Sequence, residues 1–221
     1  MSATTATGSQ ALLLAGAWLL YFLIHSALAS LSCKRWVAAH WPSVMPAYRL
    51  LFNLQSLLLL LPPLYIAYTM DGPWLWRWQG AAAWFANALA LVAIGLFLWT
   101  TRYYDSGAFS GLKQWRERIG TVEDQERFHL SPLHRFVRHP WYLLGLVLIW
   151  TRDMNIAFLL SSLAASAYFI IGSRLEEGKL IAYHGERYRR YRQRVPGLFP
   201  LPWRFLNENE AKVLLHDERN G

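Results

Sequence analysis

The fold is decided by residues 138–177, which read RHPWYLLGLVLIWTRDMNIAFLLSSLAASAYFIIGSRLEE. Two apolar runs, 141–150 and 156–171, are separated by a polar turn. At about 1.5 Å per residue, the first run covers about half of a ~30 Å hydrocarbon core, and the second crosses most of it. The pattern therefore predicts a helical hairpin with a short and a long arm. Its two ends, Arg138-His139 and Glu176-Glu177, are expected to meet on one side of a membrane.

Three longer apolar runs precede this hairpin, at 11–31, 48–68 and 80–100. Each is about 20 residues long, the length that a membrane-spanning helix needs. The composition agrees, since 54% of the residues are hydrophobic and 16% are charged, whereas a soluble domain carries about a quarter charged residues. We therefore predict an all-α polytopic membrane protein with about five transmembrane helices, the last two forming the hairpin.

The loops between the runs differ in charge. The segments at 33–46 and 101–137 carry Lys and Arg, whereas the loop at 69–79 has one Asp, one Arg and three Trp. Basic loops stay on the cytoplasmic side of a membrane, and tryptophan is enriched at its interfaces. The N-terminus is therefore expected outside, and residues 101–140 inside.

The chain carries 22 Lys+Arg and 14 Asp+Glu, for a net charge of +8. We interpret this excess as the positive-inside bias together with attraction to anionic membrane lipids. No nucleic-acid partner is expected, because the basic residues flank apolar runs and form no recognition module. No metal is expected either, because Cys33 is the only cysteine and has no partners for a zinc site.

The predicted organisation has four parts. Residues 1–10 are small and polar and are expected to be disordered, and residues 11–100 form a three-helix membrane scaffold. Residues 101–202 hold a cytoplasmic segment, the hairpin and a C-terminal lid, with a helix break at Gly185. Residues 203–221 form a polar tail.

The two ends of the hairpin carry complementary charges. Arg138 and His139 offer donors for an anion, and Pro140 starts a helix whose free N–H groups favour negative charge. Glu176 and Glu177 suit an ammonium or sulfonium group, and nearby aromatic side chains suit a soft cation or a base. S-adenosylmethionine satisfies all these demands, and a phospholipid headgroup satisfies most of them.

A structural interpretation competes with this one. An ion pair of Arg138 with Glu176 or Glu177 would close the foot of the hairpin, and the Arg/Tyr-rich stretch after it would be a headgroup-binding helix. The residue types alone do not choose between these two interpretations.

A longer pattern carries a family resemblance. It comprises Arg138-His139-Pro140-x-Tyr142, the hairpin, Glu176-Glu177, Gly185-Glu186-x-Tyr188-x-x-Tyr191-x-x-Arg194-Val195-Pro196 and Pro200. This series resembles the isoprenylcysteine carboxyl methyltransferase superfamily of integral-membrane methyltransferases. His25-Ser26, Gly111-Leu112-Lys113-Gln114 and Ile171-Gly172-x-Arg174 make the chain most similar to the bacterial branch that includes methanethiol S-methyltransferases and NnrU-like proteins.

The resemblance implies a cytoplasmic site for S-adenosyl-L-methionine in a bacterial inner-membrane protein. Arg138 and His139 would hold its carboxylate, Glu176 its amino group, and Tyr188 and Arg194 would shape the lid. The full set of implied cofactor contacts is Phe128, His129, Leu130, His134, Arg138, His139, Pro140, Tyr142, Glu176, Tyr188 and Arg194. The acceptor would be a small molecule or a lipid-like compound, and if it is a thiol, Arg174 would stabilise its thiolate.

Two departures from the family pattern bear on these expectations. The family has glycine two residues after the motif tyrosine, but here Leu144 occupies that place and the glycine is Gly145. The eukaryotic prenylcysteine enzymes have arginine where this chain has Gly172, so a prenylcysteine carboxylate is not the expected acceptor. The alternatives are methylation of a lipid amine or carboxylate, and a non-enzymatic membrane protein that retains the fold.

Overall fold

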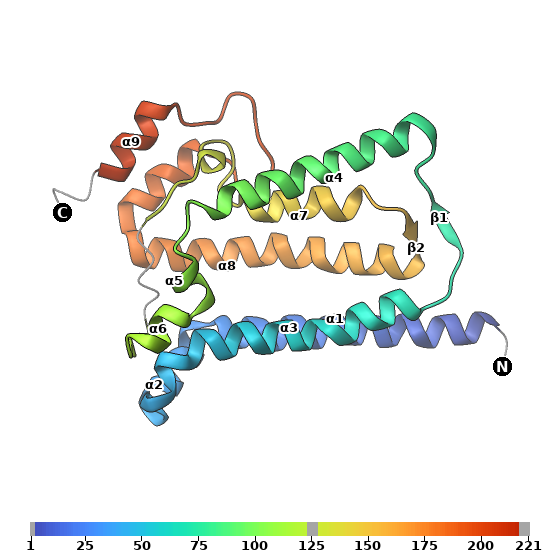
Figure 1. The fold of residues 1–221 in the computed structure, drawn as a ribbon, viewed down its shortest axis with the longest axis horizontal. Coiled ribbons are helices and arrows are strands. Elements are labelled where there is room, and N and C mark those ends of the chain that lie inside the picture. The colour runs from blue at the N-terminus through green and yellow to red at the C-terminus, as the bar shows by residue number, and fades with distance from the viewer. Residues whose placement is uncertain (1–2, 123–127, 217–221) are drawn as a thin grey trace. The chain divides into compact units, whose positions relative to one another are not determined.

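The computed structural model describes residues 3–122 and 128–216. They form two compact units that each combine segments distant in the sequence. The first unit lies within residues 1–78, 104–125 and 153–165, and the second within residues 79–103, 126–152 and 166–221. The elements, labelled in Figure 1, are α1 (Ala3–Ala29), α2 (Leu31–His40), η1 (Pro42–Val44), α3 (Met45–Thr69), β1 (Trp74–Trp76), α4 (Gly80–Thr101), α5 (Ser106–Ser110), α6 (Leu112–Arg116), η2 (Pro132–Arg135), α7 (Pro140–Trp150), β2 (Met154–Asn155), α8 (Ile156–Arg194) and α9 (Glu208–His216).

The first unit is built on the packing of α1 against α3. Polar side chains within its helices bond to neighbouring helices, as expected in an apolar environment. Trp18 Nε1 donates to Ser161 Oγ at 3.0 Å, and His25 Nδ1 lies 3.0 Å from Ser56 Oγ. Its β1 pairs antiparallel with β2. Its buried core contains Leu14, Trp18, Ala67, Met70 and Ala157.

Gly111, in the motif that precedes the hairpin, has a structural reason to be glycine. Its φ is +90°, and a Cβ at this position would lie 2.5 Å from the backbone nitrogen of Leu50. The α5–α6 turn therefore approaches the backbone of α3 more closely than any side chain allows.

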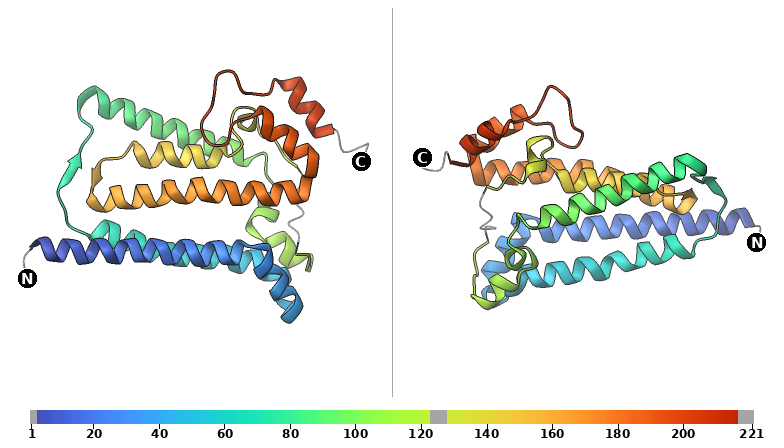
Figure 2. Two further views of the ribbon diagram at one scale, coloured as in Figure 1. Left: turned by 180° about the vertical axis from the view of Figure 1, so that it is seen from behind. Right: turned by 45° about the horizontal axis from the view of Figure 1, so that its top comes forward.

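In the second unit, α7 packs against α4, and it lies between α4 and α8 in Figures 1 and 2. Trp141 Nε1 donates to Thr100 Oγ1 on α4, and Trp150 Nε1 donates to Ser166 Oγ on α8. A Cβ on Gly145 would lie 3.1 Å from Phe169 Cε2. Gly145 thus provides close packing of α7 on α8, although it is shifted by one residue from the family's position.

Within residues 3–122 and 128–216, four helical segments are long and apolar enough to cross a membrane: Gly8–Ala29, Pro42–Thr69, Gly80–Thr101 and Ile156–Arg194. α7 is a shorter apolar helix of 11 residues, or about 16 Å, as predicted for the short arm. The all-α polytopic fold is confirmed. Gly185 breaks the regular geometry of α8, with φ +54° and ψ −130°, which confirms the predicted break.

The structure differs from the predicted organisation in two places. Residues 3–10 belong to α1 instead of a disordered segment, because each residue added to an existing helix gains a backbone hydrogen bond. The compact units do not follow the boundary between 11–100 and 101–202, because α4 packs on α7. The polar tail contains a short helix, α9, whose Ala211 is buried in the core of the second unit.

Candidate active site

The candidate site lies at the foot of the hairpin, within the second unit. α7 begins at Pro140, whose fixed φ and missing N–H suit the first helical position, and His139 is the residue that caps it. Glu176 and Glu177 lie on α8. Because successive residues on a helix diverge by about 100°, these two carboxylates approach opposite nitrogens of the His139 ring and otherwise have different partners.

Glu177 is the centre of a buried ionic network. Its Oε1 accepts from Arg138 Nε at 2.8 Å and from Arg138 Nη2 at 2.6 Å, and it lies 3.3 Å from His139 Nε2. Its Oε2 lies 3.1 Å from Arg192 Nε. The side chains of Arg138 and Glu177 are 11% and 9% exposed, so water screens this pair little.

Arg138 also donates from Nη1 to the carbonyl groups of Arg192 and Val195. Its guanidinium is therefore largely engaged by the chain itself. The ion pair considered above as the structural interpretation of Arg138 is present, and it is formed with Glu177.

Glu176 has a more open environment. Its Oε2 accepts from the hydroxyl of Tyr142 at 2.9 Å and lies 3.4 Å from His139 Nδ1. Its side chain remains 46% exposed. The rings of His139, Tyr142 and Phe169 stack in sequence, with centroids 5.4 Å and 5.1 Å apart. This stack fixes the tyrosine that orients Glu176, and it leaves part of the carboxylate accessible to a ligand.

The pKa values of two histidines near these carboxylates are shifted in opposite directions. Burial alone would lower the pKa of His139, but hydrogen bonds to Glu176 and Glu177 outweigh it and raise this pKa. Burial, followed by the charges of His129 and His139, lowers the pKa of His134 to about 3. The backbone N–H of Ser131 donates to His134 Nδ1 at 3.1 Å, and this contact requires an unprotonated nitrogen there.

These shifts predict opposite effects of pH on stability. The contribution of His134 is present above its ordinary pKa of 6.5 and is lost as the pH falls towards 3, because only the unfolded state takes up the proton readily. The contribution of His139 is present below 6.5 and is lost as the pH rises through its raised pKa. We expect His134→Asn to flatten the acid side of a plot of unfolding midpoint against pH, and His139→Asn to flatten the alkaline side. Unchanged slopes in both variants would contradict this assignment.

Beside the charged residues lies an aromatic core. Phe128, Tyr188 and Tyr191 are buried there with Leu206, and Leu130 packs against them. Tyr191 donates its hydroxyl to the carbonyl of His134 at 2.7 Å. The hydroxyl of Tyr188 is buried and faces the Arg138 guanidinium.

Residues 195–206, which we call the strap, connect α8 to α9 and pass beside the start of α7. The backbone N–H groups of Arg138 and His139 donate to the carbonyls of Pro196 and Gly197, at 2.9 and 3.1 Å. At the other end of the strap, the N–H of Leu206 donates to the carbonyl of Arg135, and Arg135 Nε donates to the carbonyl of Leu206. The strap is therefore fastened at both ends to the segment that carries the motif.

The structure brings most, but not all, of the predicted site residues together. Arg138, His139, Tyr142 and Glu176 form one cluster with Pro140 at the helix start, and Phe128, Leu130, His134 and Tyr188 lie in or against the aromatic core. Arg194 is on the surface and pairs with Glu210 of α9 at 2.6 Å, and the ring of His129 lies beside Tyr103. Arg174 is an exposed residue of α8, and its expected role in stabilising a thiolate stays a prediction.

Three features of the site were not predicted: the central role of Glu177, the Tyr191–His134 bond and the strap. Glu177 and Tyr191 belong to the quoted motif, so the motif itself was a signal for them. The strap's backbone bonds depend on chain geometry, and no residue type indicates them.

The residues present fit S-adenosylmethionine in part. The exposed portion of Glu176 suits its ammonium group. Arg138 fits the role of carboxylate ligand poorly, because Glu177 and two carbonyls already engage it.

Comparison with known proteins identifies relatives over most of the chain. No family model and no solved structure matches it. It is 32% identical to methanethiol S-methyltransferase 2 of Bradyrhizobium diazoefficiens, over 82% of this chain and 70% of that protein. It is 30% identical to the methanethiol S-methyltransferases of Pseudomonas deceptionensis (82% of this chain, 69% of the relative) and Mycobacterium tuberculosis (81% and 74%). The chain therefore belongs to the methanethiol S-methyltransferase family, in the bacterial branch that its motifs resemble.

Proposed function

We propose that this membrane methyltransferase uses S-adenosylmethionine to methylate a small or lipophilic thiol. The observation that carries the proposal is the similarity to relatives named for methanethiol S-methylation, over about four fifths of the chain. The geometry of Glu176 supports it, because a partly exposed carboxylate oriented by Tyr142 and His139 suits an ammonium group.

Each residue of the cluster has a distinct part in this proposal. Glu176 binds the ammonium group, Tyr142 and His139 orient Glu176, and the Arg138–Glu177 pair holds the start of α7 and the strap. When bound, S-adenosylmethionine supplies a methyl group on a positively charged sulfur. The surrounding apolar side chains exclude water, which favours a reaction between opposite charges.

We place this site on the cytoplasmic side of the bacterial inner membrane, with the N-terminus outside. The basic residues of the segments at 33–46 and 101–137 support this orientation. Single cysteines introduced in a Cys33→Ser background test it. Gly72→Cys should react with a membrane-impermeant maleimide on intact spheroplasts, and Glu117→Cys should react only after lysis. The opposite pattern would reverse the orientation.

The function is tested with the purified full chain in detergent, S-adenosylmethionine carrying a labelled methyl group, and panels of thiols, amines and carboxylates. We expect labelled product with thiols and little with the other two classes. Preference for a lipid amine or carboxylate would leave the enzyme class intact and overturn the thiol. Absence of calorimetric binding of both S-adenosylmethionine and S-adenosylhomocysteine at millimolar concentration would overturn the cofactor.

A further inference from the structure

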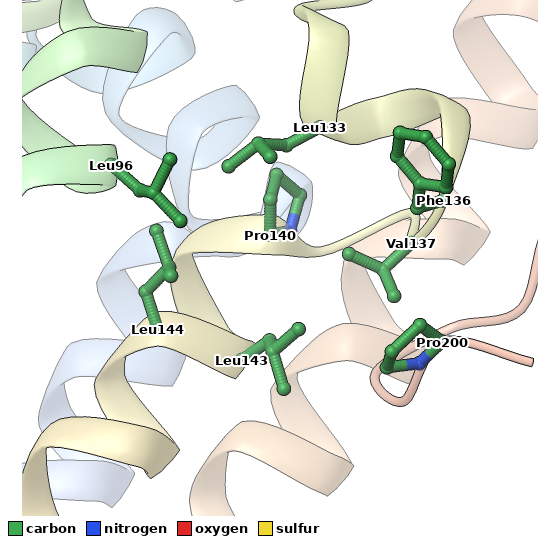
Figure 3. Close-up of a pocket in the computed structure, with 8 residues that line it drawn as sticks. All are labelled: Leu96, Leu133, Phe136, Val137, Pro140, Leu143, Leu144 and Pro200. Carbon is green, nitrogen blue, oxygen red and sulfur yellow. The ribbon is translucent and has the colours of Figure 1, made fainter. Parts of the chain in front are cut away.

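A separate cavity of about 260 Å³ lies in the second unit, walled by α4, α7, the segment around η2 and the strap. Figure 3 shows its eight lining side chains, among them Leu96, Phe136, Leu143, Leu144 and Pro200. All eight are apolar. A water molecule needs two to four polar partners, so this cavity suits a hydrocarbon.

The cavity shares Pro140 with the candidate site, but it lies on the side of α7 away from Tyr142. Leu144 follows Tyr142 by two residues on α7, or about 200° around the helix, so the two side chains leave α7 on opposite sides. The volume is also below the ~300–1,000 Å³ of pockets that enclose whole ligands. It therefore accommodates a segment of a chain better than a complete cofactor.

The wall formed by α4 is continuous with a surface that faces lipid. α4 is long and apolar enough to cross a membrane, Leu96 is half-buried, and the adjacent Phe97 is 40% exposed. A lipid chain lying along this helix would reach the cavity without crossing a polar surface.

The other rim of the cavity has the composition of a membrane interface. Phe136 stacks on Phe205, and Phe199 and Trp203 on the strap are 60% and 76% exposed. Tryptophan concentrates at headgroup level, and Trp203 is the most exposed of these four side chains. An acyl chain entering here would therefore leave its headgroup beside the strap.

The positive charge near the strap favours anionic lipid headgroups over zwitterionic ones. Residues 187–206 include six arginines and no Asp or Glu. Three of them, Arg189, Arg192 and Arg194, pair with glutamates elsewhere in the chain, whereas Arg204 lies on the strap and Arg102 is exposed at the end of α4. Basic residues at an interface attract anionic lipids. A zwitterionic headgroup lacks the net charge that would gain from this environment.

We propose that the cavity binds one acyl chain of an anionic phospholipid, whose headgroup lies against Arg204 of the strap and Arg102 at the end of α4. Lipid tails are as apolar as the cavity wall, so the selectivity comes from packing and headgroup charge rather than from the hydrophobic effect. The proposal does not depend on the methyl-transfer reaction, since the lipid would bind with or without cofactor and acceptor.

Photocrosslinking in nanodiscs tests the proposal. The full chain is reconstituted with phosphatidylglycerol that carries a diazirine on its acyl chain, and labelled positions are mapped by mass spectrometry. We expect labelling within residues 96–102 and 133–144, about tenfold weaker when the same probe carries a phosphatidylcholine headgroup. Equal labelling by the two headgroups, or no labelling of these segments, would overturn the proposal.

Matched variants locate the chain in the cavity. Leu96→Phe fills it and should lower labelling about tenfold, because a packed site does not admit extra volume. Leu98→Phe, on the exposed side of the same helix, should change nothing, and Leu143→Phe repeats the test from α7. Unchanged labelling in the folded filling variants would overturn the cavity as the binding site. Loss of labelling on adding a long-chain alkanethiol acceptor would assign the cavity to the acceptor instead.

Discussion

Glu176→Gln is expected to weaken binding of S-adenosylhomocysteine by about tenfold to a hundredfold, because a hydrogen bond to a charged group contributes about 1.5–3 kcal/mol. Glutamine keeps the size of the side chain and an oxygen for the hydroxyl of Tyr142. The substitution removes the negative charge that the proposed ammonium contact requires. Isothermal titration calorimetry of the purified protein in detergent measures the loss.

A second ligand, which lacks the ammonium group, provides the control for this variant. 5′-Methylthioadenosine has the same nucleoside and sulfur but no amino-acid portion, so its affinity should be equal in the wild type and in Glu176→Gln. Glu186→Gln, which removes an exposed carboxylate paired with Arg189 on the same helix, should bind both ligands normally. If Glu176→Gln weakens both ligands equally, Glu176 supports the site indirectly and does not contact the ammonium group.

The sequence predicted the membrane fold well because lipid imposes strict demands on chain length and apolarity. The predicted runs at 48–68 and 80–100 correspond closely to α3 and α4, and the short and long arms to α7 and α8. The division of the chain into compact units was harder to predict from the sequence, because it depends on which helices pack together. The packing of α4 on α7 joins residues on either side of the predicted boundary, and hydrophobic periodicity carries no information about such partners.

The sequence predicted which charged residues lie together better than it predicted which of them form pairs. Complementary charges at the two ends of a hairpin correctly placed Arg138 and His139 beside Glu176 and Glu177. Which carboxylate meets which cation depends on the rotation of α8, and one residue changes that direction by about 100°. Arg138 was expected to bind the cofactor, but it meets Glu177 and the end of α8.

Glu177→Leu is expected to lower the free energy of unfolding by about 3–5 kcal/mol, because it leaves Arg138 as a buried charge without its carboxylate. For a chain of this length, each kcal/mol corresponds to about 2–4 °C, so thermal unfolding measures the loss directly. The strap should also become more sensitive to protease, because Arg138 donates to the carbonyls of Arg192 and Val195 next to it.

The double variant Arg138→Leu/Glu177→Leu separates a paired charge from two independent contacts. Replacing both members of a buried pair with apolar residues is often nearly neutral, so the double variant should be more stable than Glu177→Leu alone. Glu208→Ala, which removes an exposed pair with Lys212, should shift the unfolding free energy by about 0.5 kcal/mol or less. If the losses of unfolding free energy in the two single variants simply add in the double variant, Arg138 stabilises the strap through its bonds to the carbonyls, independently of Glu177. Recovery of stability in the double variant, with the strap again protected from protease, would show that the pair is the element that fixes the strap to the start of α7.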